Sequence, residues 1–138
     1  MGNQQLLLLV LGTIIVGLAV SVGITQFRAY QVEAEGDEIQ STIMSIVADA
    51  RIHAEKPTTL GGGGGSFAGF RIQASKVPRS YGVSYSMTPR TGQSLSFRGQ
   101  NRSGSITARL YHQQGGFTIL WQCDGDYSDR TKPSRPLE

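Results

Sequence analysis

The chain opens on a long, uninterrupted run of apolar side chains. Residues 6–24 read LLLLVLGTIIVGLAVSVGI, with thirteen Leu, Ile or Val and no charge or proline. As an α-helix rising about 1.5 Å per residue, the run is roughly 28 Å long, about the thickness of a bilayer's hydrocarbon core. Each Leu, Ile or Val favours insertion by about 0.3–0.6 kcal/mol at the helix centre, so membrane insertion is predicted.

The apolar run passes directly into an amphipathic pattern. Residues 27–56 contain no proline and one glycine, Gly36, which is interpreted as a bend or a loosened turn. Apolar residues recur there at helical spacing, namely Ile39, Ile43, Ile46, Val47, Ala50 and Ala54. One helix is therefore predicted from about Gln4 to about Glu55, apolar first and amphipathic afterwards, with Pro57 ending it.

Beyond Pro57 the period of the pattern changes from helical to two. Apolar and polar residues alternate in short runs around positions 70–72, 81–87, 94–98, 106–111 and 117–123. Such alternation is typical of strands with one buried face. Turn-forming residues separate the later runs at 89–92, 101–104 and 113–116. We expect an α+β fold, in which the amphipathic half of the helix covers an antiparallel meander of four or five strands.

These patterns divide the chain into five segments. They are an apolar stem (1–26), the amphipathic continuation of the helix (27–57), a glycine-rich connector (58–66), a β-domain (67–123) and a polar tail (124–138). The connector's five consecutive glycines do not fit a phosphate-binding loop, because no strand precedes them, no helix follows them and no Lys-Ser/Thr pair ends them. They are interpreted as a flexible connector or as a close backbone crossing over a neighbour. The tail lacks periodicity, so it is expected to be extended or disordered, or to lie along a neighbouring subunit.

Acidic and basic residues are segregated along the chain. No Asp or Glu occurs from Pro57 to Cys123, where seven residues are basic, whereas residues 31–55 carry six acids against one arginine. Three interpretations are open: complementary contacts between subunits, a basic surface for nucleic acid or another polyanion, and a solvated surface with weak internal pairs. The first interpretation would use Glu33, Glu35, Asp37, Glu38, Arg71, Arg79, Arg98, Arg102 and Arg109.

Residues suited to catalysis or metal binding are sparse and scattered. His53 and His112 lie far apart and lack further ligands at metal-binding spacing. The β-domain has no carboxylate for an acid–base pair, and the lone Cys123 cannot form an internal disulfide. The sequence therefore predicts no enzyme, metal site or cofactor. Asn101 begins an Asn-Arg-Ser glycosylation sequon, whose use stays open.

A glycine near the start, a long apolar helix that turns amphipathic and a small β-rich domain together resemble the type IV pilin and pseudopilin superfamily. The resemblance is architectural over the whole chain, and its motif content lies in the first two dozen residues. In that family a prepilin peptidase cuts after a glycine, which implies cleavage after Gly2 and Asn3 as the first mature residue. Leu7 stands where the family usually has a glutamate, at the fifth mature position, so the chain resembles a divergent member.

The resemblance implies a structural subunit that polymerises through its N-terminal helix into an extracellular, pilus-like filament of identical copies. Before assembly it would wait in the cytoplasmic membrane, from which pilus assembly machinery would extract it. The alternatives are a minor pseudopilin of a secretion or DNA-uptake machine and a single-pass membrane-anchored binding module. A cleaved signal peptide is disfavoured, because no Lys or Arg precedes Leu6. The residues expected to pack in the assembly, some at the four-residue spacing of close helix contacts, are Leu6, Leu7, Leu8, Leu9, Val10, Leu11, Thr13, Ile14, Ile15, Gly17, Leu18, Ser21 and Gly23.

Overall fold

The computed structural model describes residues 2–78, 82–113, 116–130 and 135–137. A single helix, α1 (Gly2–Glu55), opens the chain, which confirms the helix predicted from the apolar pattern. The helix continues through Gly36, which is buried, and the chain leaves it just before Pro57. By its internal contacts the chain divides into two compact units, Met1–Glu35 and Gly36–Glu138.

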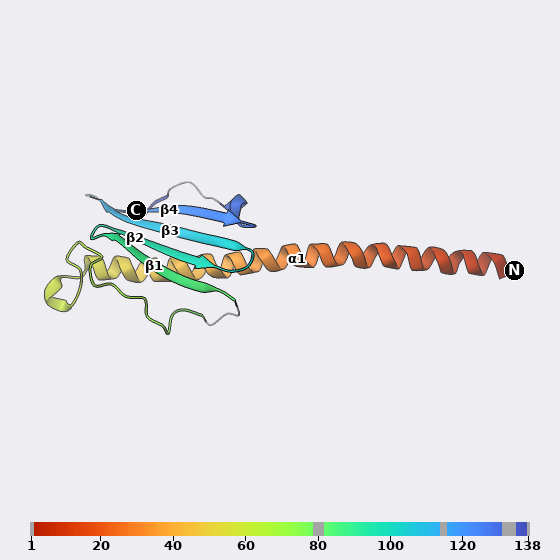
Figure 1. The fold of residues 1–138 in the computed structure, drawn as a ribbon, viewed down its shortest axis with the longest axis horizontal. Helices are drawn as coiled ribbons and strands as arrows, with labels where there is room; N and C mark the ends of the chain where they lie inside the picture. Colours follow the sequence, from red (N-terminus) through yellow and green to blue (C-terminus); the bar gives the residue numbers. More distant parts are fainter. Residues whose placement is uncertain (1, 79–81, 114–115, 131–134, 138) are drawn as a thin grey trace. The chain divides into compact units, whose positions relative to one another are not determined.

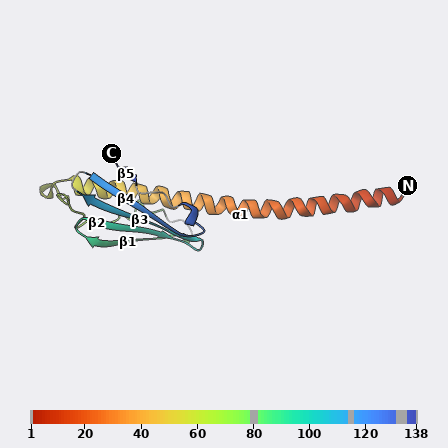
Figure 2. The same cartoon turned by 90° about the horizontal axis from the view of Figure 1, so that it is seen from above.

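The strands of the second unit form one antiparallel sheet in the order β1-β2-β3-β4-β5, in which each strand pairs with the next along the chain. The strands are β1 (Ser84–Thr91), β2 (Ser94–Gln100), β3 (Gly104–Gln113), β4 (Gly116–Gly125) and the short β5 (Arg135–Leu137). Figures 1 and 2 show the C-terminal part of α1, drawn in yellow, lying against this sheet. The predicted α+β fold with an antiparallel meander is confirmed.

The core of the second unit lies between α1 and one face of the sheet. The helix contributes the six apolar residues that recur at helical spacing, and all six are buried. The strands contribute alternate residues, so the period-two pattern has placed its apolar positions correctly. The buried hydrophobic residues of the strands are Leu95, Phe97, Ile106, Ala108, Leu110, Phe117 and Ile119. Gly99 lies directly under Ile39, where a Cβ atom would crowd the isoleucine methyl group, so the missing side chain lets the helix approach β2.

The five consecutive glycines form a cap on the last turn of α1. After the 3-10 helix η1 (Thr58–Leu60), the chain turns back and its amides donate to the final helical carbonyls. Gly63 N donates to His53 O at 2.7 Å, Gly65 N to Ala54 O at 2.8 Å and Gly64 N to Lys56 O at 3.0 Å. These carbonyls would otherwise lack partners at the helix end. The glycines are therefore held by hydrogen bonds to the end of their own helix, an arrangement that was not predicted from the sequence.

The beginning of the C-terminal tail is packed, contrary to expectation. β4 continues to Gly125, and Tyr127 follows with its side chain fully buried. The Tyr127 hydroxyl accepts a hydrogen bond of 2.7 Å from the side-chain amide of Asn101, in the turn between β2 and β3. A 3-10 helix, η2 (Ser128–Arg130), comes next, and β5 returns along β4 with Leu137 opposite Phe117. One aromatic anchor with a polar partner thus orders a segment that has no periodicity of its own.

Three smaller expectations about strands and turns also need correction. Residues 70–72 form no strand, and the first strand begins at Ser84 rather than near residue 81, which lies outside the described residues. The predicted turn at 89–92 begins too early, because β1 runs on to Thr91 through a register irregularity after Pro89. Proline is found in sheets mainly on edge strands and at bulges, and Pro89 fits both, because β1 is an edge strand and the register irregularity follows Pro89 directly. The centre of the turn predicted at 113–116 also lies outside the described residues.

The side chain of Tyr85 places its hydroxyl group in the interior. Its hydroxyl oxygen is buried and has no hydrogen-bond partner of good geometry among the described residues. Burial raises the pKa of Tyr85 above its usual value, the nearby Thr42 side chain lowers it, and the charge of Glu38 raises it further. Because the folded state holds this proton more tightly than the unfolded chain does, the contribution of Tyr85 to stability is lost as the pH rises above about 10.

Replacing Gly63 with Ala tests the glycine cap. A Cβ atom at this position would overlap the Ser66 carbonyl oxygen, so the loop must shift and give up its bond to His53. We expect Gly63→Ala to lower the free energy of unfolding by about 2–3 kcal/mol. The measurement is denaturant unfolding of the full chain in detergent micelles, followed by the fluorescence of its one tryptophan.

The matched control is Thr59→Ala, an exposed position in the same loop, which should change the free energy of unfolding by no more than about 0.5 kcal/mol. Equal stability of Gly63→Ala and the parent chain would show that the glycines form no cap.

Candidate assembly and binding surfaces

The first surface of interest is the uninterrupted apolar run within the predicted stem segment, residues 6–24 of α1, which is called the stem from here on. Its large apolar side chains are 51–70% exposed, and no described residue covers them. This part of α1 is long and apolar enough to cross a membrane. A soluble monomer rarely exposes so large a continuous apolar surface, so the stem needs lipid or other protein around it.

The polar groups within the stem are satisfied by the helix itself. Thr13 Oγ1 donates to Val10 O and Ser21 Oγ donates to Leu18 O, both at 2.8 Å. Such bonds to the preceding turn leave no hydroxyl donor in need of water. A Cβ atom added at Gly17 would meet nothing within 4 Å, so this glycine makes no close contact inside its own chain. The predicted packing residues all lie in the exposed N-terminal part of α1, and Gly2 and Asn3 are the first two residues of this helix.

The second surface is the face of the sheet that points away from α1, where the strands present their polar residues. It carries a hollow of about 330 Å³, called here the outer hollow. The residues that line it are Ser86, Thr88, Ser96, Arg98, Ser105, Thr107, Arg109, Gln122 and Asp124. Two of these, Arg98 and Arg109, are among the residues predicted from the sequence to make charge-complementary contacts. The signal for the others was the polar half of the same period-two alternation that located the core.

Strand register places the two arginines of the outer hollow as diagonal neighbours. Arg98 on β2 lies opposite Thr107 on β3, and Arg109 is two residues further along β3. Arg98 Nη2 donates to Ser105 Oγ and Arg109 Nη2 to Gln122 Oε1, each at 3.0 Å. Both arginines thus bond neutral side chains, and neither forms an ion pair within the described part of the chain.

The remaining residues proposed for charge complementarity are dispersed. Glu33 and Glu35 belong to the first unit, whereas Asp37 and Glu38 belong to the second, and all four are exposed. Arg71 is exposed in the loop after the glycine cap, Arg102 is exposed in the turn between β2 and β3, and Arg79 lies outside the described residues.

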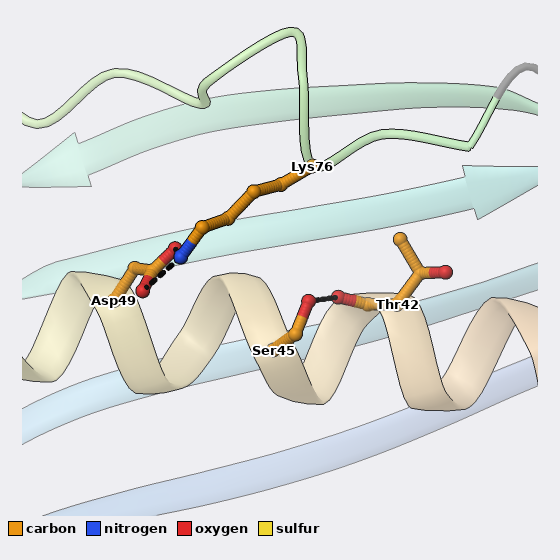
Figure 3. A network of polar contacts seen from close by, with 4 residues as sticks. All are labelled: Thr42, Ser45, Asp49 and Lys76. Atoms are coloured by element: carbon orange, nitrogen blue, oxygen red, sulfur yellow. Dashed lines mark hydrogen bonds and ion pairs between the residues drawn. The ribbon is translucent and has the colours of Figure 1, made fainter.

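One ion pair joins the two charge regions within a single chain. Lys76 Nζ reaches Asp49 on α1, with its two oxygen contacts at 2.6 and 2.7 Å (Figure 3). Its side chains are 44% and 30% exposed, so its contribution to stability is at most about 1 kcal/mol. Part of the acidic and basic segregation along the sequence is therefore used for an ion pair within a single chain.

Both histidines have structural partners. His112 stacks on Phe117 with ring centroids 4.8 Å apart, and its Nδ1 lies 2.7 Å from Gly65 O in the glycine cap. His53 Nε2 lies 3.0 Å from Ala68 O. Within the described ranges, no group of three or more His, Cys, Asp or Glu could hold a metal ion. The histidines therefore link the cap to the sheet and the following loop.

Asn101 also has a structural role. Its Oδ1 accepts hydrogen bonds from the Ser103 and Gly104 amides at 3.0 and 3.1 Å, closing the turn between β2 and β3. Its Nδ2 donates to the buried Tyr127 hydroxyl. The sequon residue thus connects two segments of the fold.

Comparisons with protein-family models, with curated proteins and with solved structures found no match to this chain.

Charge placed in the stem should abolish membrane association. Leu11→Arg combined with Ile15→Arg changes the insertion free energy by roughly 6 kcal/mol, because each Arg at a helix centre is unfavourable by about 2.5–3.5 kcal/mol. We expect this double variant to leave the membrane fraction on alkaline carbonate extraction of cells that express it.

The matched control is Ile52→Arg combined with Leu60→Arg. These residues are 62% and 64% exposed but lie outside the stem, so the control should stay with the membrane. Retention of the stem variant would contradict membrane insertion through residues 6–24.

Removing the Asn101 side chain should loosen the C-terminal segment. Asn101→Ala deletes three hydrogen bonds and leaves the fully buried Tyr127 hydroxyl without its amide donor. We expect a loss of about 2–3 kcal/mol in the free energy of unfolding, with faster amide hydrogen exchange in β4 near Gly125. Arg102→Ala, in the same turn, serves as the control and should be neutral. An unchanged Asn101→Ala variant would show that these bonds do not hold the segment.

Proposed function

We propose that this chain is a structural subunit that polymerises through its N-terminal helix into a pilus-like filament at the cell surface. The observation that carries the proposal is the stem: nineteen consecutive uncharged residues, exposed on every side, in a helix whose hydroxyls bond to its own backbone. Before assembly, the hydrocarbon chains of the membrane would shield such a surface from water. Outside the membrane, only the stems of other copies offer an equivalent environment.

The energetic basis is the hydrophobic effect, at roughly 25 cal/mol per Å² of apolar surface removed from water. Every copy carries the same stem, so burying each one among its neighbours repeats this gain along the polymer. Thr13, Gly17 and Ser21 recur every four residues and would allow close approach of helix backbones in the apolar filament core. The second unit, with its polar sheet face, would then form the outside of the filament.

The order of the parts also supports this function. A long helix that begins apolar and then covers a small antiparallel sheet resembles the architecture of type IV pilins and pseudopilins. The proposed life cycle follows from that resemblance: cleavage after Gly2, residence in the cytoplasmic membrane and extraction by assembly machinery. Since Leu7 replaces the usual glutamate of that family, stem packing rather than a charge pair would set the subunit register.

A single-pass membrane-anchored binding module is the second candidate. The outer hollow favours it, because that surface could serve a binding function without any polymerisation. The two candidates make opposite predictions about oligomeric state, since an anchored module stays monomeric in detergent and forms no fibres.

Gly17→Leu should separate membrane insertion from filament formation. Leucine is more favourable in lipid than glycine, so insertion should persist. Its bulk should prevent close helix approach in the filament core, so filaments should fall at least about tenfold in material sheared from the cell surface and viewed by electron microscopy.

Val16→Leu, at the adjacent position, adds apolar volume outside the small-residue row and should leave filament yield within about twofold. Parent protein that forms no filaments and remains monomeric in detergent would overturn the proposed function. Normal filaments from Gly17→Leu would reject this residue as a packing contact.

A further inference from the structure

The outer hollow brings two positive charges together, and neither arginine forms an ion pair with a described residue. Diagonal neighbours on one face of an antiparallel pair lie roughly 7–8 Å apart at their Cα atoms. Arg98 and Arg109 occupy such positions and lean the same way, each toward a partner nearer the turn between β2 and β3. Like charges this close repel each other, so the arrangement favours an anion that both arginines can share.

The arginines also keep most of their hydrogen-bonding capacity. A guanidinium has five N–H donors in a fixed fork. Arg98 gives one bond to Ser105 and Arg109 one to Gln122, which leaves donors for a ligand. A planar carboxylate matches this fork with two parallel, charge-assisted bonds.

Asp124 restricts the kind of ligand that the outer hollow can bind. Among the described residues it is the one acid that lines the hollow, and its Oδ1 already accepts a bond of 2.9 Å from the Gly125 amide. A carboxylate can only accept hydrogen bonds, so Asp124 repels a simple polyanion but accepts from hydroxyl groups. Neutral hydroxyls from Ser86 and Thr107 add groups that donate and accept.

These features indicate a ligand that carries both a carboxylate and hydroxyl groups. We propose that the outer hollow binds a carboxylate-bearing sugar unit of an acidic polysaccharide, with the carboxylate on Arg98 and Arg109 and the sugar hydroxyls on Asp124 and its neighbours. The volume of about 330 Å³ lies at the lower end of the range for small-ligand sites, as a single sugar unit requires. The proposal goes beyond filament formation and does not depend on it.

Nucleic acid fits the same surface less well. Proteins that bind single strands stack bases on aromatic side chains, and no aromatic residue lines the hollow. Duplex binders neutralise several phosphates with a stripe of basic residues, whereas here two arginines stand beside an aspartate. The acidic run at residues 33–38 of a second copy offers carboxylates but has no hydroxyl group that could donate to Asp124.

The test measures binding of polygalacturonate to the full chain in detergent micelles by isothermal titration calorimetry. Dextran serves as the neutral polysaccharide and a short DNA duplex as the competing polyanion. We expect binding to polygalacturonate, competition by free galacturonic acid, and no binding to dextran. Arg98→Gln combined with Arg109→Gln should weaken binding at least about tenfold, because it removes both charge-assisted contacts.

The matched control is Arg71→Gln combined with Arg102→Gln. It removes the same charge from exposed positions outside the hollow, and affinity should stay within about twofold. Asp124→Asn provides the sharper test, since its Oδ1 can still accept from Gly125. Sugar recognition predicts at least about threefold weaker binding for this variant, whereas attraction of a polyanion by charge alone predicts stronger binding.

Four results would overturn the proposal: no binding of polygalacturonate, equal or tighter binding of the DNA duplex, equal losses in the two arginine double variants, or tighter binding by Asp124→Asn. The loss of filaments in Arg98→Gln combined with Arg109→Gln, without polygalacturonate binding by the parent chain, would assign this face to contacts between copies instead. Filament formation is scored separately by electron microscopy, so failure of either proposal leaves the other testable.

Discussion

The exclusion of water from α1 is the constraint on which the rest of the structure depends. The helix meets this constraint in two ways along its length. From residue 39 onward its apolar stripe is covered by the sheet of the same chain. From residue 6 to residue 24 no described residue covers it, so the solution has to come from outside the chain. The same helix therefore supports folding at one end and, at the other, exposes an apolar surface suited to lipid or other protein.

The covered half of α1 depends on details at both its surface and its end. Gly99 removes a side chain where Ile39 meets β2, so that helix and sheet pack closely. The glycine cap occupies the last carbonyls with backbone amides, and His112 then ties the cap to β3. Arg51 lies over the ring of Phe117, 5.3 Å from its centroid, and His112 stacks on the same ring at an interplanar angle of 24°. Helix end, loop and sheet are thus joined by a small number of specific contacts.

The sequence predicted the parts of the fold that follow a regular period. The helix, its buried face and the alternate apolar residues of β2, β3 and β4 were all correct, because periods of 3.6 and 2 are fixed by backbone geometry. The glycine cap and the Tyr127 anchor were missed, because each depends on partners distant in the sequence. His53 meets Gly63, and Asn101 meets Tyr127, only after the chain has folded.

The two surfaces also differ in how far the sequence predicted them, because one is continuous in the sequence and the other depends on strand pairing. The stem was visible in the sequence, since nineteen adjacent apolar or small residues need no partner to be recognised. The outer hollow was not predicted; the sequence showed only that Arg98 and Arg109 belong to a basic region. Its character comes from strand register, which brings Arg98, Arg109 and Asp124 from three strands to one face. A one-residue slip of any strand would turn its contribution to the opposite face.

The position of Asn101 has a consequence for when the chain could be modified. An oligosaccharide transferred to this residue would be attached at Nδ2, the atom that donates to Tyr127. Attachment would replace one of the two Nδ2 hydrogens and place a sugar beside the fully buried Tyr127 side chain, so it would compete for space with closure of the C-terminal segment. A transferase would therefore have to act on the nascent or unfolded polypeptide. In a chain that had folded first, the Asn101 amide would already be engaged by Tyr127.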